Sequence, residues 1–266
     1  MQSAFDKYER RMWAGRADAY GRTFARLCAH LVPALLDAAG VAAGLDVLDV
    51  GTGTGSAAAA ASARGARVTA IDADAHMVEA ARRNVPGAEV RRATLPRLPF
   101  GDGTFDAVTG NFVVNHVGDP GTALAEMRRV LRPGGRLAAT IWRHPGEAGQ
   151  ALLWRAVDAA GVEKPELPRV EADFPRTEEG FAALLSGAGL RTVDCVSVVW
   201  DHREDPERWW SGAAEGIATI GLVLGRLSPD VRAVVRTHYE RLAAAFVHPD
   251  GTLALPHAAL LAHGTR

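Results

Sequence analysis

Residues 47–55 limit most strongly what this chain can fold into. They read Val-Leu-Asp-Val-Gly-Thr-Gly-Thr-Gly, an apolar run followed by three alternating glycines. Small residues then fill positions 56–63, and Gly65 follows, which predicts a helix directly after the loop. The stretch therefore predicts a buried strand, then a tight loop, and then a helix whose first N–H groups are free. Because glycine lets the backbone approach a bound molecule closely, we expect a ligand here rather than an ordinary turn.

The glycine spacing separates two kinds of nucleotide ligand. A dinucleotide fingerprint needs a third Gly or Ala three residues after the second glycine. Ser56 stands at that position, and Gly55 comes one residue earlier. Asp49 lies just before the first glycine, where its carboxylate would repel a diphosphate but attract an ammonium group. The stretch therefore favours a nucleoside that carries an amino acid.

This stretch resembles motif I of class I S-adenosylmethionine (SAM) dependent methyltransferases. The turn Arg132-Pro133-Gly134-Gly135 and the segment Leu98-Pro99-Phe100 resemble the ubiquinone/menaquinone biosynthesis type, and the resemblance covers residues 44–143. It implies SAM as the cofactor. It also implies an α/β fold with a doubly wound, seven-stranded, mostly parallel sheet of order 3-2-1-4-5-7-6, strand seven being antiparallel. Right-handed crossovers fix this layout through strand five.

Further cofactor residues are expected beyond the carboxyl ends of the strands, where open α/β sheets bind ligands. Asp72 ends the second strand, so its carboxylate can accept both ribose hydroxyl protons of SAM or of NAD. Met77 begins the next helix, where we expect the adenine, core packing being the alternative. Thr94 stands where the resembling enzymes carry Asp, so its uncharged hydroxyl replaces a carboxylate. The expected cofactor set is Asp49, Gly51, Thr52, Gly53, Gly55, Asp72, Ala73, Met77, Ala93, Thr94, Leu95 and Asn111.

The domain organisation follows from helical spacing on both sides of the sheet. Residues 1–43 carry aromatic groups at near-helical spacing and predict a first helix and a second one over about 23–39. These helices either pack on the sheet edge or form a lid over the ligands. Residues 44–266 form the SAM-binding domain.

The last two strands are predicted far apart in the sequence. The sixth covers residues 193–200, and the seventh covers residues 253–262 with a break at Pro256. So long a connection is unusual. We interpret residues 203–250 as an inserted helical cap over the acceptor pocket.

Methyl transfer from a sulfonium is an in-line displacement that mainly needs alignment of two molecules. A base is required only when the acceptor arrives protonated. His116, after the fourth strand, is the first candidate base, followed by His144 and then His202; each could instead be an ordinary surface or hydrogen-bonded histidine. Adjacent helical residues point about 100° apart, so only one of Trp209 and Trp210 is expected to face the pocket. The expected acceptor pocket comprises Trp13, Tyr20, Asn115, His116, Trp209 and Trp210.

Composition narrows the function classes. The net charge of −1 over 266 residues gives no electrostatic footprint for nucleic acid. Two cysteines predict no disulfide framework, and we expect no signal peptide, membrane span or metal. We therefore expect a cytoplasmic protein. We also expect a monomer or a homodimer.

The leading hypothesis is methyl transfer from SAM to a small-molecule acceptor, favouring a hydroxyl of an aromatic or polyketide-like metabolite, with nitrogen or carbon acceptors open. A second hypothesis is a SAM-binding protein of this fold that catalyses a rearrangement or elimination, or only binds ligand. A nicotinamide oxidoreductase is a more distant third.

Overall fold

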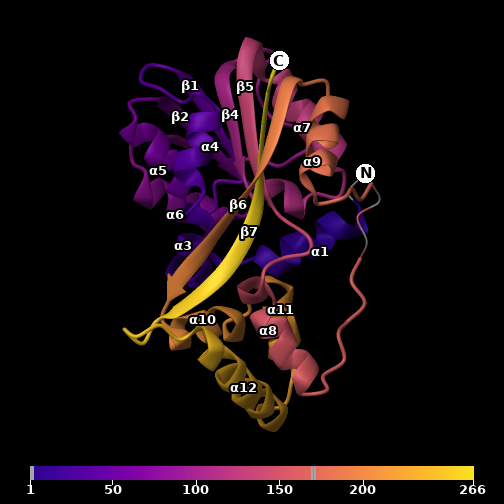
Figure 1. The fold of residues 1–266 in the computed structure, drawn as a ribbon. Coiled ribbons are helices and arrows are strands. Elements are labelled where there is room, and N and C mark those ends of the chain that lie inside the picture. Colours follow the sequence, from indigo (N-terminus) through magenta and orange to yellow (C-terminus); the bar gives the residue numbers. More distant parts are fainter. Residues whose placement is uncertain (1–2, 169, 171) are drawn as a thin grey trace.

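The computed structural model describes residues 3–168, 170 and 172–266. Its centre is a seven-stranded sheet of order β3-β2-β1-β4-β5-β7-β6, flanked by helices (Figure 1). The strands are β1 (Asp46–Val50), β2 (Arg67–Asp72), β3 (Glu89–Arg92), β4 (Phe105–Asn111), β5 (Leu131–Trp142), β6 (Arg191–Glu204) and β7 (Leu253–Thr265). Only β7 runs antiparallel to its neighbours. The predicted fold class and strand order are confirmed.

The apolar run at 47–50 forms the buried centre of this sheet. All four residues are buried, as expected for a parallel strand covered on both faces. Val50 pairs with Ile71 of β2, and Asp49 pairs with Thr109 of β4. Because these strands are parallel, the loops that follow them meet at one edge of the sheet.

Within residues 3–45, four helices precede β1. They are α1 (Ala4–Trp13), α2 (Ala17–Arg22), α3 (Phe24–Ala29) and α4 (Val32–Ala38). The single helix predicted over 23–39 is wrong, because two helices, α3 and α4, occupy this stretch. Pro33 lies in the first turn of α4 and has no N–H with which to continue a helix from α3.

Between β1 and β6, helices connect most of the successive strands, and α5 covers the helix predicted over residues 56–63. These helices are α5 (Ser56–Ala63), α6 (Ala75–Asn84), η1 (Val113–His116), α7 (Pro120–Arg129), α8 (Ala148–Ala159) and α9 (Glu178–Gly187). The side chain of Asp74 accepts hydrogen bonds from the amides of His76 and Met77, and Thr177 caps α9 in the same way. Asp and Thr are residue types that favour this capping position.

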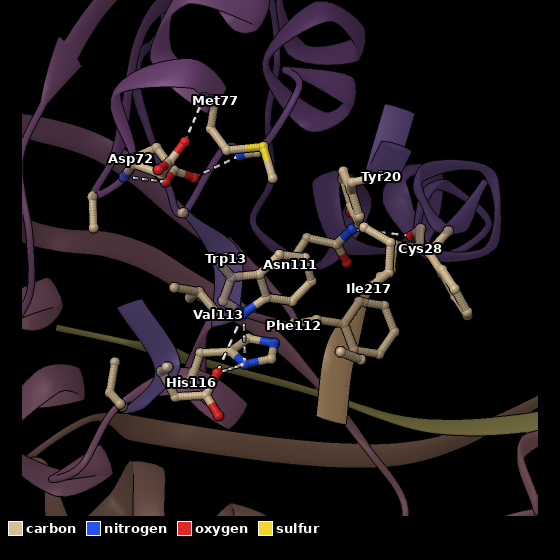
Figure 2. A pocket seen from close by; sticks show the side chains of 18 of the residues that line it. Trp13, Tyr20, Cys28, Asp72, Met77, Asn111, Phe112, Val113, His116 and Ile217 are labelled. Atoms are coloured by element: carbon tan, nitrogen blue, oxygen red, sulfur yellow. Dashed lines mark hydrogen bonds and ion pairs between the residues drawn. The ribbon is translucent and has the colours of Figure 1, made fainter. Parts of the chain in front are cut away.

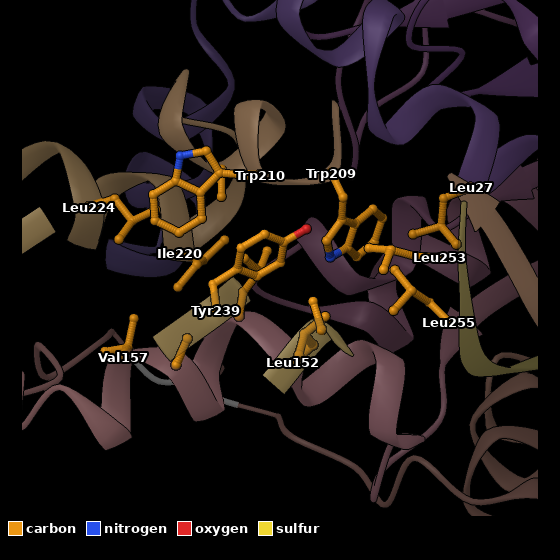
Figure 3. Packing of buried hydrophobic residues seen from close by; sticks show 14 of the residues in the cluster. Leu27, Leu152, Val157, Trp209, Trp210, Ile220, Leu224, Tyr239, Leu253 and Leu255 are labelled. Atoms are coloured by element: carbon orange, nitrogen blue, oxygen red, sulfur yellow. The ribbon is translucent and has the colours of Figure 1, made fainter. Parts of the chain in front are cut away.

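The expected insertion between β6 and β7 is helical. It contains α10 (Pro206–Ala214), α11 (Ala218–Arg226), α12 (Pro229–Ala243) and η2 (Ala244–Phe246), which lie at the lower end of the sheet in Figure 1. Trp210 packs on Tyr239 with ring centroids 5.3 Å apart, and Leu152 of α8 and Leu253 of β7 belong to the same cluster of buried residues (Figure 3). The inserted helices, α8 and the end of β7 therefore share one hydrophobic core.

Strand β7 is continuous, so the break predicted at Pro256 is wrong. Pro256 pairs with Asp201, and β7 remains paired with β6 as far as Leu253. The amide of Ala258 faces away from β6 and donates to Gln150 Oε1 at 2.9 Å. Residue 256 has its nitrogen on the same side, since backbone direction repeats every two residues. The missing N–H of proline therefore removes no bond of the β6–β7 ladder.

Candidate active site

A cavity of about 580 Å³ lies beyond the carboxyl ends of β1, β2 and β4. Its wall is built by α1, α2 and α3, by the loops after these three strands, and by parts of β5, α8, α10, α11 and β7. In Figure 2, Asp72 and Met77 lie at one end, and Trp13 and His116 lie together at another part of the wall. The volume is within the range of small-molecule sites.

The glycine loop is closely packed. Gly51 has φ +69°, and a Cβ there would lie 2.4 Å from Val113 Cγ2. A Cβ on Gly53 would meet the Tyr20 ring at 3.4 Å, and one on Gly55 would meet Val85 at 2.9 Å. Gly51 and Gly53 line the cavity, whereas Gly55 packs against α6 and lies outside the cavity wall. The loop thus brings its backbone to the cavity as predicted, with two glycines rather than three.

Asp72 joins the glycine loop to the end of β2. Its Oδ2 accepts from the Gly53 amide at 2.9 Å, and its Oδ1 accepts from the Asp74 amide at 2.9 Å. Burial raises the pKa of this carboxyl group. Each carboxylate oxygen keeps further acceptor capacity, and the residue lines the cavity, so a ribose diol fits this position.

Asp49 lies behind the loop and not in the cavity wall. Its side chain is only 1% exposed and accepts hydrogen bonds from the hydroxyls of Thr52 at 2.7 Å and Thr109 at 2.9 Å. Burial raises the pKa of Asp49 to about 6. Val50 faces the cavity instead, because successive side chains of a strand point to opposite faces. Asp49 and Thr52 thus brace the loop from behind the cavity wall, and the contact of Asp49 with an ammonium group and the cofactor role of Thr52 stay predictions.

The remaining expected cofactor residues line the cavity. These are Ala73, Met77, Ala93, Thr94, Leu95 and Asn111. The side chains of two of these residues already make hydrogen bonds within the protein. Thr94 Oγ1 accepts from Arg10 Nη2 at 3.1 Å, and Asn111 donates to the Cys28 carbonyl at 3.0 Å while accepting from Thr140 Oγ1 at 2.7 Å. Asn111 therefore also fixes α3 and β5 against β4.

His116 is held by an acidic residue that the sequence analysis did not single out. Glu9 of α1 is 7% exposed, and its Oε2 lies 2.7 Å from His116 Nδ1. Trp13 Nε1 donates to the same oxygen at 3.3 Å. With Nδ1–H donating to the carboxylate, Nε2 of His116 is left with its lone pair. The only sequence signal was an acid one turn before Trp13 on the apolar face of a helix.

The other end of the cavity has an aromatic wall. Trp209 lines it and packs against Phe24 with centroids 5.0 Å apart, while Phe112 stacks on Trp142 at 4.2 Å. Trp210 is turned away toward Tyr239, in agreement with the expectation that one of the two tryptophans packs. Trp13 and Tyr20 also line the cavity, as predicted from their sequence positions.

Three further candidate residues also lie outside the cavity wall. Asn115 donates to the Phe112 carbonyl, His144 is exposed beyond β5, and His202 is buried in β6. Asn115 and His144 belong to a helical turn and a loop that direct their side chains elsewhere. Successive side chains of β6 point to opposite faces of the sheet, and this alternation sets the face on which His202 lies.

The fold and this cavity define the class of protein, a doubly wound α/β domain with a nucleoside-type site at its carboxyl edge. A family model described as "Methyltransferase domain" matches residues 48–139. A demethylmenaquinone methyltransferase of Beutenbergia cavernae is 36% identical over 60% of this chain and 71% of its own. The chain therefore belongs to the class I SAM-dependent methyltransferases, in the menaquinone-type group.

Two other similarities are more distant. A malonyl-[acyl-carrier protein] O-methyltransferase of Pseudescherichia vulneris is 28% identical over 91% of each chain. The crystal structure of the [4+2]-cyclase SpnF has the same fold, with a TM-score of 0.54 and 19% identity over 89% of this chain and 80% of that one. The matched segment spans 47% and 32% of the first curated relatives.

The charges around the glycine loop fit SAM. The Asp72 carboxylate binds the loop amide of Gly53, and Asp74 also lines the wall, with Arg92 beside them through its bond to the Ala73 carbonyl. A cationic sulfonium ligand is attracted by such a wall, whereas a diphosphate would be repelled. Asp72 would hold the ribose, Met77 and residues 93–95 would contact the adenine, and the backbone at Gly51 and Gly53 would approach the amino acid part.

Proposed function

We propose that this chain transfers a methyl group from SAM to a hydroxyl of a small, planar and largely apolar acceptor. The observation that carries the proposal is the His116–Glu9 pair in the wall of a cavity that joins a carboxylate-lined end to an aromatic end. A base is useful when the acceptor hydroxyl is protonated, and a histidine fixed by a carboxylate can supply one.

The residues of the chain have separable tasks in this reaction. Bound SAM supplies an electrophilic methyl group on a sulfonium. Glu9 accepts the Nδ1–H of His116 and fixes its tautomer, so that Nε2 takes the proton of the acceptor hydroxyl. The aromatic rings of Trp209 and Phe112 hold the acceptor by apolar contact and exclude water.

We further propose that residues 1–43 and 203–250 act as a lid and a cap over this cavity. The hydroxyl oxygen of Tyr8 in α1 lies 3.1 Å from Thr219 Oγ1 of α11, and this contact joins the two segments. Within the described residues, no helix is both long and apolar enough to span a membrane. A cytoplasmic location remains a prediction.

A labelled methyl group tests the activity. The protein is incubated with SAM carrying a labelled methyl and with planar phenols such as naphthols and hydroxyquinolines. Labelled product together with S-adenosylhomocysteine supports methyl transfer. The same fold in a [4+2]-cyclase keeps a second candidate open, a reaction without methyl transfer. Product that forms without label and without S-adenosylhomocysteine would favour that candidate.

The substitution Asp72→Ala is expected to weaken SAM binding more than tenfold. It removes the charged acceptor of two ribose hydroxyls, and bonds to charged groups contribute about 1.5–3 kcal/mol. It also frees the Gly53 amide that Asp72 holds. Isothermal titration calorimetry measures the effect, with Asp194→Ala as a control, because that carboxylate is exposed on β6. An unchanged dissociation constant for Asp72→Ala would place the ribose elsewhere.

The substitutions Trp209→Ala and Trp210→Ala are expected to act differently. Trp209 faces the cavity, so its loss should raise the KM for the acceptor about tenfold or more and leave SAM affinity almost intact. Trp210 packs in the core, so its loss should lower the melting temperature instead. Steady-state kinetics and thermal unfolding separate the two effects. Equal acceptor kinetics for the wild type and Trp209→Ala would contradict this pocket.

A further inference from the structure

A second histidine lies in the aromatic part of the cavity wall. His257 of β7 is 1% exposed and lines the cavity, although it is remote from His116 in the sequence. Its ring centroid lies 5.5 Å from that of Trp209 and 6.0 Å from that of Trp142. An imidazole in such surroundings is the main polar group available to a ligand there.

The hydrogen bonding of His257 fixes its tautomer. Nδ1 lies 2.8 Å from the carbonyl oxygen of Leu255, so Nδ1 carries the proton and donates it. Nε2 then has a lone pair, and within the part of the chain that the structure describes the His257 ring makes its hydrogen bond through Nδ1 and not through Nε2. Burial lowers the pKa of His257 to about 4, so the ring is neutral near neutral pH. The ring therefore offers an acceptor and no charge.

The charged side chains of the described cavity wall come from segments other than β7, and Asp201 of β6, outside this wall, is a charge that acts on His257. The charged groups of the described cavity wall, other than histidines, come from α1 and from the segments after β2 and β3, and are Asp6, Glu9, Arg10, Asp72, Asp74 and Arg92. Gln150 and Trp209 are polar residues of the wall near His257; Gln150 Oε1 already accepts from the amides of Glu147 and Ala258, and Trp209 Nε1 is an uncharged donor. An anionic acceptor would lose its hydration at this end without gaining a cation.

We propose that His257 Nε2 anchors the acceptor by accepting a hydrogen bond from a hydroxyl or N–H group of a neutral aromatic molecule. This inference rests on the proposed function and defines its substrate class. The acceptor has one hydroxyl at His116, a second donor group at His257, and a planar apolar body between them. A carboxylate acceptor is excluded, so a malonyl thioester, with its free carboxylate, is not a substrate.

Binding of three naphthalene probes tests the anchor. They are 2-naphthol, 2-methoxynaphthalene, which lacks the donor hydrogen, and 2-naphthoate, which carries a charge. Titrations follow tryptophan fluorescence in the presence of S-adenosylhomocysteine. They use the wild type and a His116→Ala background, in which His257 is the remaining histidine of the described cavity wall. In both proteins, 2-naphthol should bind about three- to tenfold more tightly than 2-methoxynaphthalene, as one neutral hydrogen bond allows.

The substitution His257→Phe should bring this affinity ratio close to one in the His116→Ala background, while the affinity for 2-methoxynaphthalene stays within about twofold. His202→Phe is the matched control, because His202 is buried beside His257 but outside the cavity wall, and the ratio should persist. His257→Gln retains a carbonyl acceptor and should keep part of the affinity ratio. This variant also tests the anchor if His257→Phe does not fold.

Three results would overturn the proposal. They are a ratio that survives His257→Phe, tight binding of 2-naphthoate, and the absence of 2-naphthol binding to the wild type. Transfer of labelled methyl from SAM is measured separately. Its failure would count against the proposed function, whereas the affinity ratio reports on His257 alone.

Discussion

Replacement of Gly51 by valine is expected to abolish SAM binding and to destabilise the protein. Gly51 has φ +69°, a conformation that costs a β-branched residue about 1–3 kcal/mol. Its Cβ would also lie 2.4 Å from Val113 Cγ2 and 2.8 Å from Val113 Cβ, and overpacking of this kind costs about 1–3 kcal/mol more. Since η1 carries both Val113 and His116, the displacement would reach the candidate base. Calorimetry with SAM and thermal unfolding measure the two effects.

Two other glycines provide comparisons. At Gly87 a Cβ would have no atom within 4 Å and φ is not positive, so Gly87→Val should leave stability and SAM affinity nearly unchanged. Gly53→Val should destabilise the fold less than Gly51→Val, because its Cβ meets only the edge of the Tyr20 ring at 3.4 Å. It should still remove SAM binding, because the side chain would enter the cavity wall. Wild-type SAM affinity in Gly51→Val would show that the ligand does not approach this loop.

The sheet could be predicted from sequence because local patterns define it. The run at 47–50 predicts a buried strand, the glycines predict the loop, and Asp72 follows an apolar strand. Right-handed crossovers then leave few layouts, so the strand order was predictable as far as β5. The break predicted at Pro256 is wrong because a proline interrupts a strand only where a neighbouring strand needs an N–H at that position. Only the paired sheet shows whether it does.

The direction of side chains around the site was harder to predict. Asp49 borders the glycine loop in sequence, yet the hydroxyls of Thr52 and Thr109 hold it behind that loop. Glu9 and His257 reach the cavity through packing of segments far apart in the chain, and neither belongs to a local motif. Periodicity predicts which face of an element is apolar, but the packing of distant elements decides which wall that face forms.

The substitution His116→Ala is expected to lower turnover of a neutral phenolic acceptor about 10²-fold or more, since general bases contribute about 10²–10⁴. SAM affinity should remain close to that of the wild type, because Asp72 and Met77, which are proposed to hold the ribose and the adenine, lie at another part of the cavity wall. The deficit should shrink as the pH rises, because an acceptor that ionises in solution no longer needs a base. A rate that is lowered equally at every pH would indicate a positioning role instead.

Two further variants separate the base from its support. Glu9→Gln preserves the shape of the side chain but removes the charge that fixes the His116 tautomer, so it should cost less than His116→Ala, about tenfold in kcat. His144→Ala is the control, because His144 is exposed and outside the cavity wall, and its kcat and KM should match those of the wild type. Full activity of His116→Ala at neutral pH would mean that the acceptor arrives ionised or that another group takes the proton. The pair would then be a structural contact between α1 and η1, and the proposal of base-assisted transfer would fail.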